Sequence, residues 1–287
     1  MRVIVLGSKG QLGSDVASVL EAAGLNVSRV TRHELDASSP HSADQMGALP
    51  KADFLVNCMA FVNVDAAENA SGEAFQVNAT FPTHLATHCR VTGAKLIHIS
   101  TDFVFKGDLG RAYLESDESA PVNIYGLSKA AGELGVRGAL REHFILRVSG
   151  LYGVAGSGSK GGNFVETMIN LGRERGVLQV VDDQFTSPTH SLDVARAILA
   201  IILDSNAAYG TFHCANEGLC SWFEFAREII RQARIPADVK PVKFANFKMK
   251  APRPLFSALS SAKLKTVYAM PKWQDALAEY MTLRHSR

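Results

Sequence analysis

Tyr125 and Lys129 are the residues whose types and spacing first suggest chemistry. They lie in the stretch NIYGLSKAAGE, residues 123–133, where small residues surround both. Four residues is just over one helical turn, so a helix here would place both side chains on one face. Because such a pair also occurs on ordinary solvated helices, its meaning depends on the elements that position it.

A tyrosine beside a lysine suits the reduction of a ketone. Hydride transfer leaves negative charge on the carbonyl oxygen, and an acid must supply a proton there. A free tyrosine, with a pKa of about 10, is poorly matched to neutral pH. A lysine ammonium at about 4 Å would favour the phenolate by about 4 kcal/mol at an effective dielectric of about 20. We therefore expect Lys129 to lower the pKa of Tyr125, by up to about three pKa units, and to hold the cofactor ribose.

A second group of polar residues follows a predicted strand at residues 95–100. The stretch HISTDFVF places Thr101 and Asp102 at its carboxyl end, where parallel sheets build their active sites. We expect Thr101 to offer its hydroxyl to the same carbonyl oxygen. Asp102 is either part of the proton network or a cap of the local loop.

The positioning elements follow from an alternation of apolar strands and amphipathic helices. Strands are predicted at residues 2–6, 26–31, 53–59, 95–100 and 144–148, and helices between them. This rhythm predicts right-handed β-α-β crossovers and an α/β fold, a Rossmann-type doubly wound parallel sheet with a smaller C-terminal substrate-binding lobe.

The alternation of strands and helices becomes less regular after residue 150, where we place the boundary between the predicted domains. We assign residues 1–150 to an NADPH-binding Rossmann domain and 151–287 mainly to the substrate-binding lobe, with a strand and helix around 190–216 returning to the first domain. SWFE at residues 221–224 matches a capping box that opens a helix. Residues 236–254 are proline-rich and predicted to be irregular or extended.

Composition narrows the class of protein. The 287 residues carry a formal net charge of +2 and are 47% hydrophobic, which gives no electrostatic case for nucleic acid or an anionic membrane. The most apolar helix-like stretch, residues 197–203, is far shorter than the roughly 18 to 20 residues that span a bilayer. The N-terminal apolar run is too short for a signal peptide. We predict a cytoplasmic protein.

Cysteines and histidines give no sign of a metal. The four cysteines are scattered without zinc spacing, at Cys58, Cys89, Cys214 and Cys220, and favour a reducing compartment. The nine histidines lack a ligand pattern, so no catalytic metal is expected.

The first strand ends in a glycine loop, GSKGQLG, residues 7–13. Its glycines, spaced G-x-x-G-x-x-G, permit a tight turn and a close backbone approach to a pyrophosphate at a helix N-terminus. Although a plain β-α turn would look similar, its place at the first junction favours a dinucleotide. The second predicted strand is followed by Arg32 and His33, with no acid before Glu34. An arginine can pair with a 2′-phosphate, so NADPH is expected, with NADH as the weaker alternative.

At this point the chain resembles a known family. The segments GSKGQLG, STDFVF, YGLSK, NFVETM, VVDDQFTSPT and APRPLFSALSS follow one order over nearly the whole length. Together they are similar to extended short-chain dehydrogenase/reductases, and among these to the dTDP-4-dehydrorhamnose reductase family. The resemblance implies NADPH-dependent reduction of the C4 keto group of dTDP-4-dehydro-L-rhamnose to dTDP-L-rhamnose, for polysaccharide biosynthesis. It also implies the site: Tyr125 as acid, Lys129 beside it and Thr101 assisting.

The resemblance assigns further residues by position. Those expected along the cofactor are Gly7, Gly10, Gln11, Leu12, Arg32, Asp36, Ala60, Phe61, Val62 and Ile99. Those expected on the nucleotide-sugar side are Thr101, Val104, Phe105, Asn163 and Arg253. For Asn163 an N-cap of the following helix is an equal alternative, and Arg253 could instead be a solvated arginine.

Two departures from the family affect the expected substrate. Phe61 and Val62 stand where the family has Tyr or His and then Thr, and Gly150 stands where it has Trp. Losing that indole would remove about 1 kcal/mol or more of packing against the sugar. A reductase or epimerase for another nucleotide sugar therefore stays open, as does a non-catalytic NADP-binding subunit. A 4,6-dehydratase is disfavoured because Phe103 cannot transfer a proton. A homodimer is compatible with the sequence, which does not reveal the oligomeric state.

Overall fold

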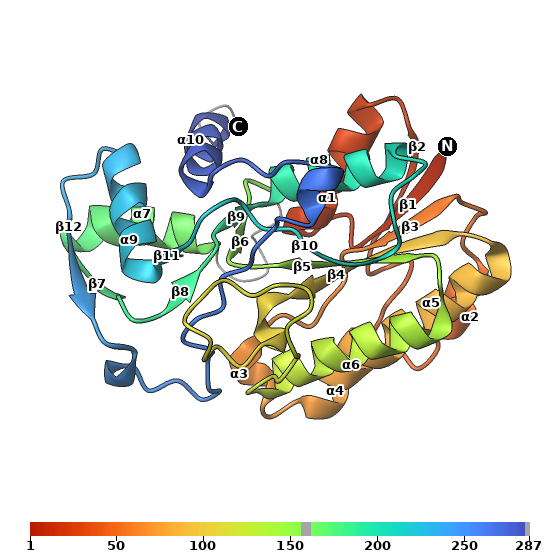
Figure 1. Ribbon diagram of the computed structural model, residues 1–287, viewed down its shortest axis with the longest axis horizontal. Coiled ribbons are helices and arrows are strands. Elements are labelled where there is room, and N and C mark those ends of the chain that lie inside the picture. Colours follow the sequence, from red (N-terminus) through yellow and green to blue (C-terminus); the bar gives the residue numbers. More distant parts are fainter. Residues whose placement is uncertain (156–161, 285–287) are drawn as a thin grey trace.

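A six-stranded parallel sheet forms the centre of the molecule (Figure 1). The computed structural model describes residues 1–155 and 162–284. The strand order is β10-β5-β4-β3-β1-β2, so the chain leaves β1 toward β2 and then crosses to β3 on the other side. The strands are β1 (Arg2–Leu6), β2 (Asn26–Val30), β3 (Phe54–Asn57), β4 (Lys95–Thr101), β5 (His143–Val148) and β10 (Gly210–His213). The predicted doubly wound sheet is confirmed, with its switch point between β1 and β3.

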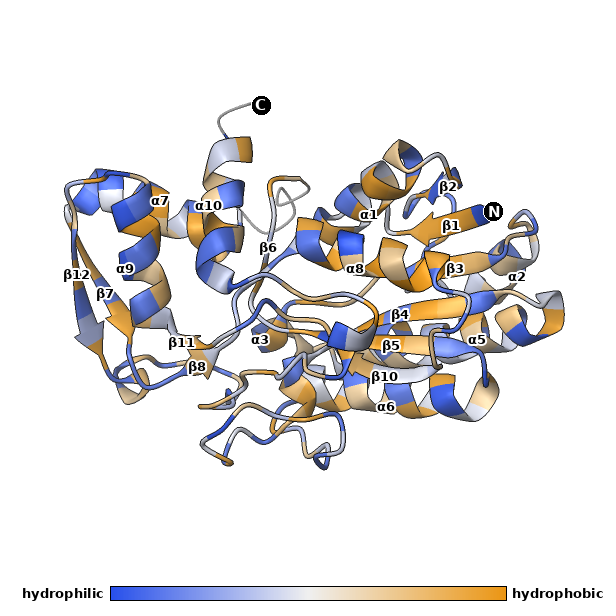
Figure 2. Cartoon of the chain, turned by 45° about the horizontal axis from the view of Figure 1, so that its top comes forward, coloured by the Kyte–Doolittle hydropathy of each residue, from blue (hydrophilic) through white to orange (hydrophobic). Residues whose placement is uncertain are grey.

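Helices cover both faces of this sheet because its strands are apolar on both sides. In β1, Val3 and Val5 belong to one core, and Ile4 and Leu6 belong to the other. Figure 2 shows much of β4 and β5 in the orange of hydrophobic residues. The covering helices are α1 (Gln11–Ala22) and α8 (Ser191–Leu203) on the first face, and α2 (Ser42–Gly47), α5 (Phe81–Thr92) and α6 (Ile124–Ala139) on the second.

The helical stretch before β4 contains a π-helix. The sequence predicts a helix over residues 74–92, and the structure divides this region into α4 (Ser71–Phe75), the π-helical η1 (Gln76–Thr80) and α5. The short helix α3 (Val64–Ala67) precedes them. π-Helical turns are often found near functional sites, and η1 packs against α6.

The C-terminal region builds a separate core beside the sheet. Its larger elements are α7 (Phe164–Arg175), β7 (Val177–Val181), α9 (Trp222–Gln232), β12 (Asp238–Val242) and α10 (Trp273–Leu283). Its short elements are β6 (Leu151–Tyr152), β8 (Phe185–Thr186), β9 (Thr189–His190), β11 (Cys220–Ser221) and the 3-10 turns η4 (Phe244–Asn246) and η5 (Leu264–Thr266). A further 3-10 turn, η2 (Asp102–Val104), directly follows β4. The capping box is confirmed: Ser221 and Glu224 cap α9 reciprocally.

The chain returns from this region to the main sheet. Helix α8 packs against α1, and β10 pairs with β5 as the edge strand. In the described ranges, no helix combines the length and apolarity needed to cross a membrane.

Candidate active site

Helix α6 places Tyr125 and Lys129 on the carboxyl end of β4. The Lys129 ammonium donates a hydrogen bond to the Ile99 carbonyl at 2.6 Å. The Thr101 hydroxyl lies close enough to the Tyr125 phenol to lower its pKa, and the Phe103 ring meets the Tyr125 ring edge-on at 5.6 Å between centroids. The pair therefore faces the sheet edge where parallel α/β proteins bind ligands.

The N-terminus of α6 is tied down by three contacts. The Asn123 side chain caps the helix by accepting from the Gly126 N–H at 2.8 Å, and it donates to the Pro252 carbonyl at 2.8 Å. Glu68 accepts from the Ile124 N–H at 2.9 Å. These contacts fix the first turn of α6, on which Tyr125 lies, against α3 and the late APRP segment.

Asn78 of η1 is a buried residue that the sequence analysis missed. Its amide oxygen accepts from the Phe61 N–H at 2.9 Å, and its amide nitrogen donates to the Phe61 carbonyl and to the Ser128 hydroxyl, each at 3.0 Å. Ser128 in turn donates to the Tyr125 carbonyl at 2.8 Å. Asn78 thus joins the segment after β3 to the Tyr–Lys helix. A buried Asn within an otherwise apolar helix face was the only signal for it.

Asp102 gathers three hydroxyl groups from separate segments. One of its oxygens accepts from Thr101 at 3.0 Å, and the other accepts from Ser149 at 2.9 Å and Ser257 at 2.5 Å. The Ser149 hydroxyl also shares a 2.7 Å hydrogen bond with Thr186. Burial raises the pKa of Asp102, and these hydrogen bonds oppose the rise. Asp102 therefore fixes the Thr101 hydroxyl and joins the ends of β4 and β5 to the C-terminal region.

The expected effect of Lys129 on the tyrosine pKa is wrong for this structure. Burial raises the pKa of Tyr125 to about 12, the Thr101 hydrogen bond lowers it and the Asp102 charge raises it. The pKa of Lys129 falls to about 8 because burial disfavours its charge. The ammonium points to the Ile99 carbonyl, and burial of both groups outweighs the predicted attraction.

The glycine loop has the close packing that a dinucleotide site needs. Gly7 has a φ of +74°, and Gly10 caps α1 without a side chain. A Cβ on Gly13 would lie 2.2 Å from the Gly7 carbonyl oxygen, so only glycine allows this turn. Gln11 and Leu12 begin α1, and the Gln11 amide donates to the Leu151 carbonyl at 3.3 Å. The loop fits the backbone contacts that a pyrophosphate requires.

Arg32 and Asp36 lie together after β2. The Arg32 guanidinium is 3.2 Å from the Asp36 carboxylate and also donates to Ser38 at 3.1 Å. The Arg32 side chain is 72% exposed and is therefore accessible to a phosphate. Its neighbour Arg29 instead binds Glu21 and Ser18 of α1.

The remaining cofactor residues predicted from the resemblance lie at two strand ends. Ala60, Phe61 and Val62 follow β3, and Ile99 lies in β4 beside Lys129. Their roles stay predictions.

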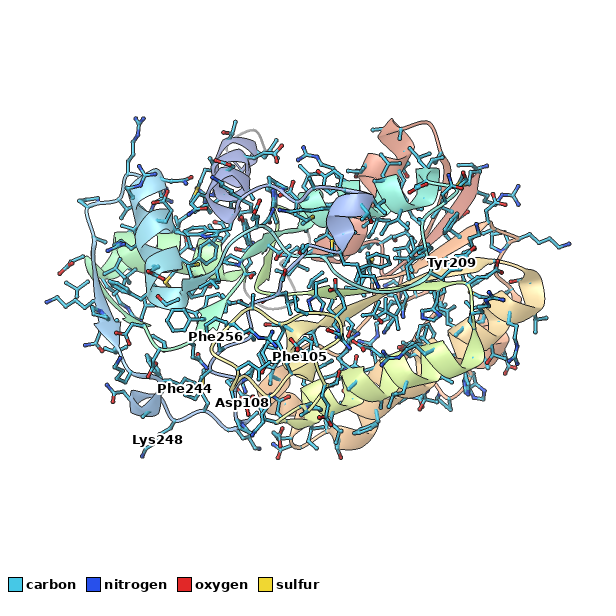
Figure 3. The ribbon with its side chains drawn as sticks, in the orientation of Figure 1. Phe105, Asp108, Tyr209, Phe244, Lys248 and Phe256 are labelled. Carbon is cyan, nitrogen blue, oxygen red and sulfur yellow. The ribbon has the colours of Figure 1, made fainter. Side chains whose placement is uncertain are left out.

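Val104 and Phe105 are not exposed to a ligand. Both side chains are fully buried in a small core with Tyr113, on which the Phe105 ring stacks at 4.1 Å. Figure 3 shows Phe105 in the interior. Apolar packing takes both side chains into the core, so this segment could meet a nucleotide sugar only through its backbone, and its expected role stays a prediction.

Asn163 and Arg253 already have protein partners. Asn163 caps α7 by accepting from the Glu166 N–H at 3.1 Å, and it donates to the Gly153 carbonyl at 2.8 Å. The N-cap alternative is thus what the structure shows. Arg253 is largely buried and pairs with Asp65 of α3 at 3.0 Å, so it is not a solvated arginine.

Three metal-binding residue types come together away from the Tyr–Lys pair. Potential ligand atoms of His190, Asp193 and Glu279 lie within 4.8 Å of one another. The Arg196 guanidinium binds Asp193 at 3.0 Å and Glu279 at 2.8 and 2.7 Å. This ion pair accounts for the clustered carboxylates.

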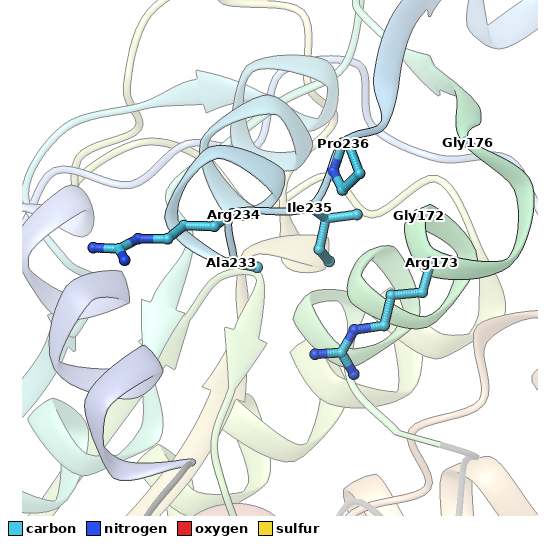
Figure 4. A pocket seen from close by; sticks show the side chains of 7 residues that line it. All are labelled: Gly172, Arg173, Gly176, Ala233, Arg234, Ile235 and Pro236. Carbon is cyan, nitrogen blue, oxygen red and sulfur yellow. The ribbon is translucent and has the colours of Figure 1, made fainter.

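A surface hollow of about 370 Å³ lies in the C-terminal region, between α7 and the turn after α9 (Figure 4). Its lining consists of Gly172, Arg173, Gly176, Ala233, Arg234, Ile235 and Pro236. With no carboxylate, hydroxyl or thiol, this lining offers no group for proton transfer.

Comparison with known proteins agrees with this geometry. The family model "RmlD substrate binding domain" matches residues 1–285. The "dTDP-4-dehydrorhamnose reductase" of Mycobacterium tuberculosis is 38% identical over 284 residues, covering 96% of this chain and 91% of the relative. The crystal structure of dTDP-4-dehydrorhamnose reductase from Bacillus anthracis in complex with NADP has a TM-score of 0.91 and 37% identity, covering 98% of this chain and 99% of that one. The "dTDP-4-keto-6-deoxy-D-glucose reductase" of Streptomyces niveus is 32% identical, covering 98% and 97%.

Proposed function

The chain belongs to the RmlD family of NAD(P)-dependent dTDP-sugar 4-keto reductases, and from this premise we propose that it reduces dTDP-4-dehydro-L-rhamnose to dTDP-L-rhamnose with NADPH. The observation that carries the proposal is the stripe formed by Tyr125 and Lys129 against Thr101 and Ile99 at the carboxyl end of β4. This stripe has an acid, a cation and a hydroxyl group in one place.

The residues that would hold NADPH are those of the glycine loop, Arg32 near the 2′-phosphate, and Lys129. When bound, the cofactor supplies the hydride. Arg32 supports the preference for NADPH because a guanidinium can pair with a 2′-phosphate and its side chain is exposed. Its ion pair with Asp36 would hold it after β2 before the cofactor arrives.

The protein's own part in the reaction is to place and supply a proton. Tyr125 donates its phenolic proton to the C4 oxygen as negative charge develops there. The Thr101 hydroxyl, which donates to Asp102 in the free protein, would turn that proton to the same oxygen once the substrate is bound. The high pKa of Tyr125, about 12, keeps the phenol protonated at neutral pH, so the proton is available for transfer.

Arg253 is the best remaining candidate for the nucleotide-sugar side. It is largely buried, already pairs with a carboxylate, and lies in the APRP segment next to the N-terminus of α6. A guanidinium in this setting suits a diphosphate. Asn163 would act more indirectly, by holding the start of α7.

A second dTDP-4-keto sugar is a specific alternative substrate. Gly150 has a φ of +51°, and a Cβ there would lie 3.2 Å from the Thr186 hydroxyl and 3.6 Å from the Trp222 ring. An indole therefore does lie beside Gly150, but it belongs to Trp222 of α9 and not to position 150, where the family resemblance implies a tryptophan. A sugar packed against this differently placed indole could differ from dTDP-4-dehydro-L-rhamnose.

The experiment is NADPH oxidation by the purified protein, offered dTDP-4-dehydro-L-rhamnose and dTDP-4-keto-6-deoxy-D-glucose in parallel. Preference for the first is expected, with loss of about 100- to 10,000-fold in kcat for Tyr125→Phe. Tyr125→Phe should still bind NADPH, as judged by fluorescence titration. Preference for the second sugar would replace the proposed substrate, and full activity of Tyr125→Phe would remove the tyrosine from its role.

A further inference from the structure

Glu133 continues the face of α6 that carries Tyr125 and Lys129. The three residues are spaced four apart and contact three successive residues of β4. Tyr125 meets Thr101, Lys129 donates to the Ile99 carbonyl at 2.6 Å, and Glu133 accepts from the Ser100 hydroxyl at 2.6 Å. The register of the catalytic helix on β4 is therefore set at Glu133 as well as at the catalytic pair.

Glu133 is itself clamped from β5. The Arg147 guanidinium binds it through two parallel hydrogen bonds, Nε to Oε1 at 2.8 Å and Nη2 to Oε2 at 2.6 Å. Arg147 also donates to Ser119 at 3.1 Å and lies 4.9 Å from the Phe105 ring centroid. Glu133 is fully buried and Arg147 is 2% exposed. The partly exposed Arg137 of α6 also donates to the Glu133 carboxylate, at 3.3 Å.

Fold stability alone is a weak reason for this ion pair, because a well-packed apolar pair of similar volume is often at least as stable. A reason appears at Lys129, whose ammonium is buried with few countercharges. Glu133 acts to keep the lysine protonated, against the effect of burial. The other titratable groups coupled to Lys129 are Cys58 and His98, and both are neutral near pH 7 because burial raises the pKa of Cys58 to about 12 and lowers that of His98.

We propose that Glu133 is a positioning residue of the reductase: clamped by Arg147 and Ser100, it places a carboxylate one helical turn from Lys129 and holds the face of α6 that carries Tyr125 at the end of β4. The inference rests on the function proposed for this site. Glu133, the glutamate of the stretch YGLSKAAGE, would thus support the function of Tyr125 and Lys129.

The test compares Glu133→Gln and the double variant Glu133→Gln/Arg147→Gln with a matched control. The double variant leaves no unpaired buried charge, so it keeps the test open if the single variant fails to fold. The control is Glu166→Gln/Arg284→Gln, which removes an ion pair of the same geometry, with N–O distances of 2.8 and 2.7 Å and a Tyr280 hydroxyl at 2.6 Å. This pair ties α7 to the C-terminus of α10, away from β4.

The measurements are the pH dependence of kcat/KM and of the NADPH dissociation constant, with thermal unfolding as a check on folding. Without Glu133, the alkaline limb of both profiles should move to lower pH by about one unit or more. The control should show the wild-type limb despite its loss of stability. Glu133→Asp, which retains the carboxylate, should restore the limb while kcat stays low.

The proposal would be overturned if the double variant folded and the alkaline limbs of its kcat/KM and NADPH-binding profiles stayed at the wild-type pH. The ion pair of Glu133 and Arg147 would then have a purely structural role. The NADPH titration needs no sugar substrate. If the chain reduced none of the dTDP-sugars tested, the titration would still decide the role of Glu133, separately from the proposed function.

Discussion

Lys129 is a cation held in a place that disfavours its charge. Its ammonium donates to one backbone carbonyl, and Glu133 opposes the effect of burial only in part, so its pKa falls from 10.5 to about 8. A group poised near neutrality can change its charge during a catalytic cycle more easily than an exposed lysine. Because the pKa of Lys129 differs between the folded and the unfolded protein, its protonation also makes fold stability depend on pH.

Lys129→Met should therefore change how stability depends on pH. Between about pH 8 and 10.5 the unfolded chain keeps the lysine proton that the folded protein has released, so this residue makes stability rise with pH. The free energy of unfolding of the wild type, relative to Lys129→Met, should increase by about 3 kcal/mol across this window. Urea unfolding at several pH values measures it. Parallel profiles for the two proteins would contradict the assignment.

Helix α6 reaches the site because glycines allow it to approach its neighbours closely. A Cβ on Gly126 would lie 2.2 Å from the Phe103 carbonyl oxygen, and one on Gly132 would lie 2.0 Å from the Asn78 carbonyl oxygen. Neither oxygen is on a flexible side chain that could move aside. How closely α6 packs against η1 and the end of β4 thus depends on the absence of a side chain at these two positions.

Gly126→Ala should push the first turn of α6 away from β4. We expect a loss of about 1 to 3 kcal/mol in the free energy of unfolding and a larger proportional loss in kcat than in NADPH affinity. Gly138→Ala is the control, because a Cβ at that position of the same helix meets nothing within 4 Å. It should stabilise the protein by up to about 1 kcal/mol. Equal effects of the two substitutions would show that close packing at Gly126 is unimportant.

Across the whole molecule, the C-terminal region closes over the sheet edge through buried polar contacts. Ser257 binds Asp102, the Pro252 carbonyl binds Asn123, and Arg253 binds Asp65. Two buried histidines lie at other packed positions: His190 precedes α8, and His213 ends β10. Burial lowers the pKa of His190 to about 4 and that of His213 to about 3.

Mild acid should destabilise the fold through these two histidines. Below pH 6.5 the unfolded chain binds protons at His190 and His213 that the folded protein refuses, so stability falls as pH falls toward 4 and then 3. At pH 5 each histidine should cost about 2 kcal/mol relative to neutral pH. Urea unfolding of the wild type and of His190→Gln/His213→Gln at pH 7 and pH 5 tests this. A drop as large in the double variant as in the wild type would assign acid sensitivity to other groups.

The fold was predictable because its signals are local. Apolar runs and helix periodicity depend on neighbouring residues, and they placed the strands, the alternation and the capping box at Ser221 correctly. The π-helical turn at η1 was not predictable, since it reflects the packing of α4, α5 and α6 together. The pKa of Tyr125 was predicted in the wrong direction because burial, a property of the whole fold, outweighs one neighbouring charge.

The sequence by itself determined the parallel α/β sheet, the glycine loop at the first strand end and the pairing of Tyr125 with Lys129, because short-range spacing encodes each of them. Only the tertiary structure decided which residues support that pair. Asn78, Ser149 and Ser257 come from segments far apart in the chain, and folding alone brings them to one sheet edge. It also took Val104 and Phe105 into the core, because apolar side chains are more stable there than beside a polar ligand.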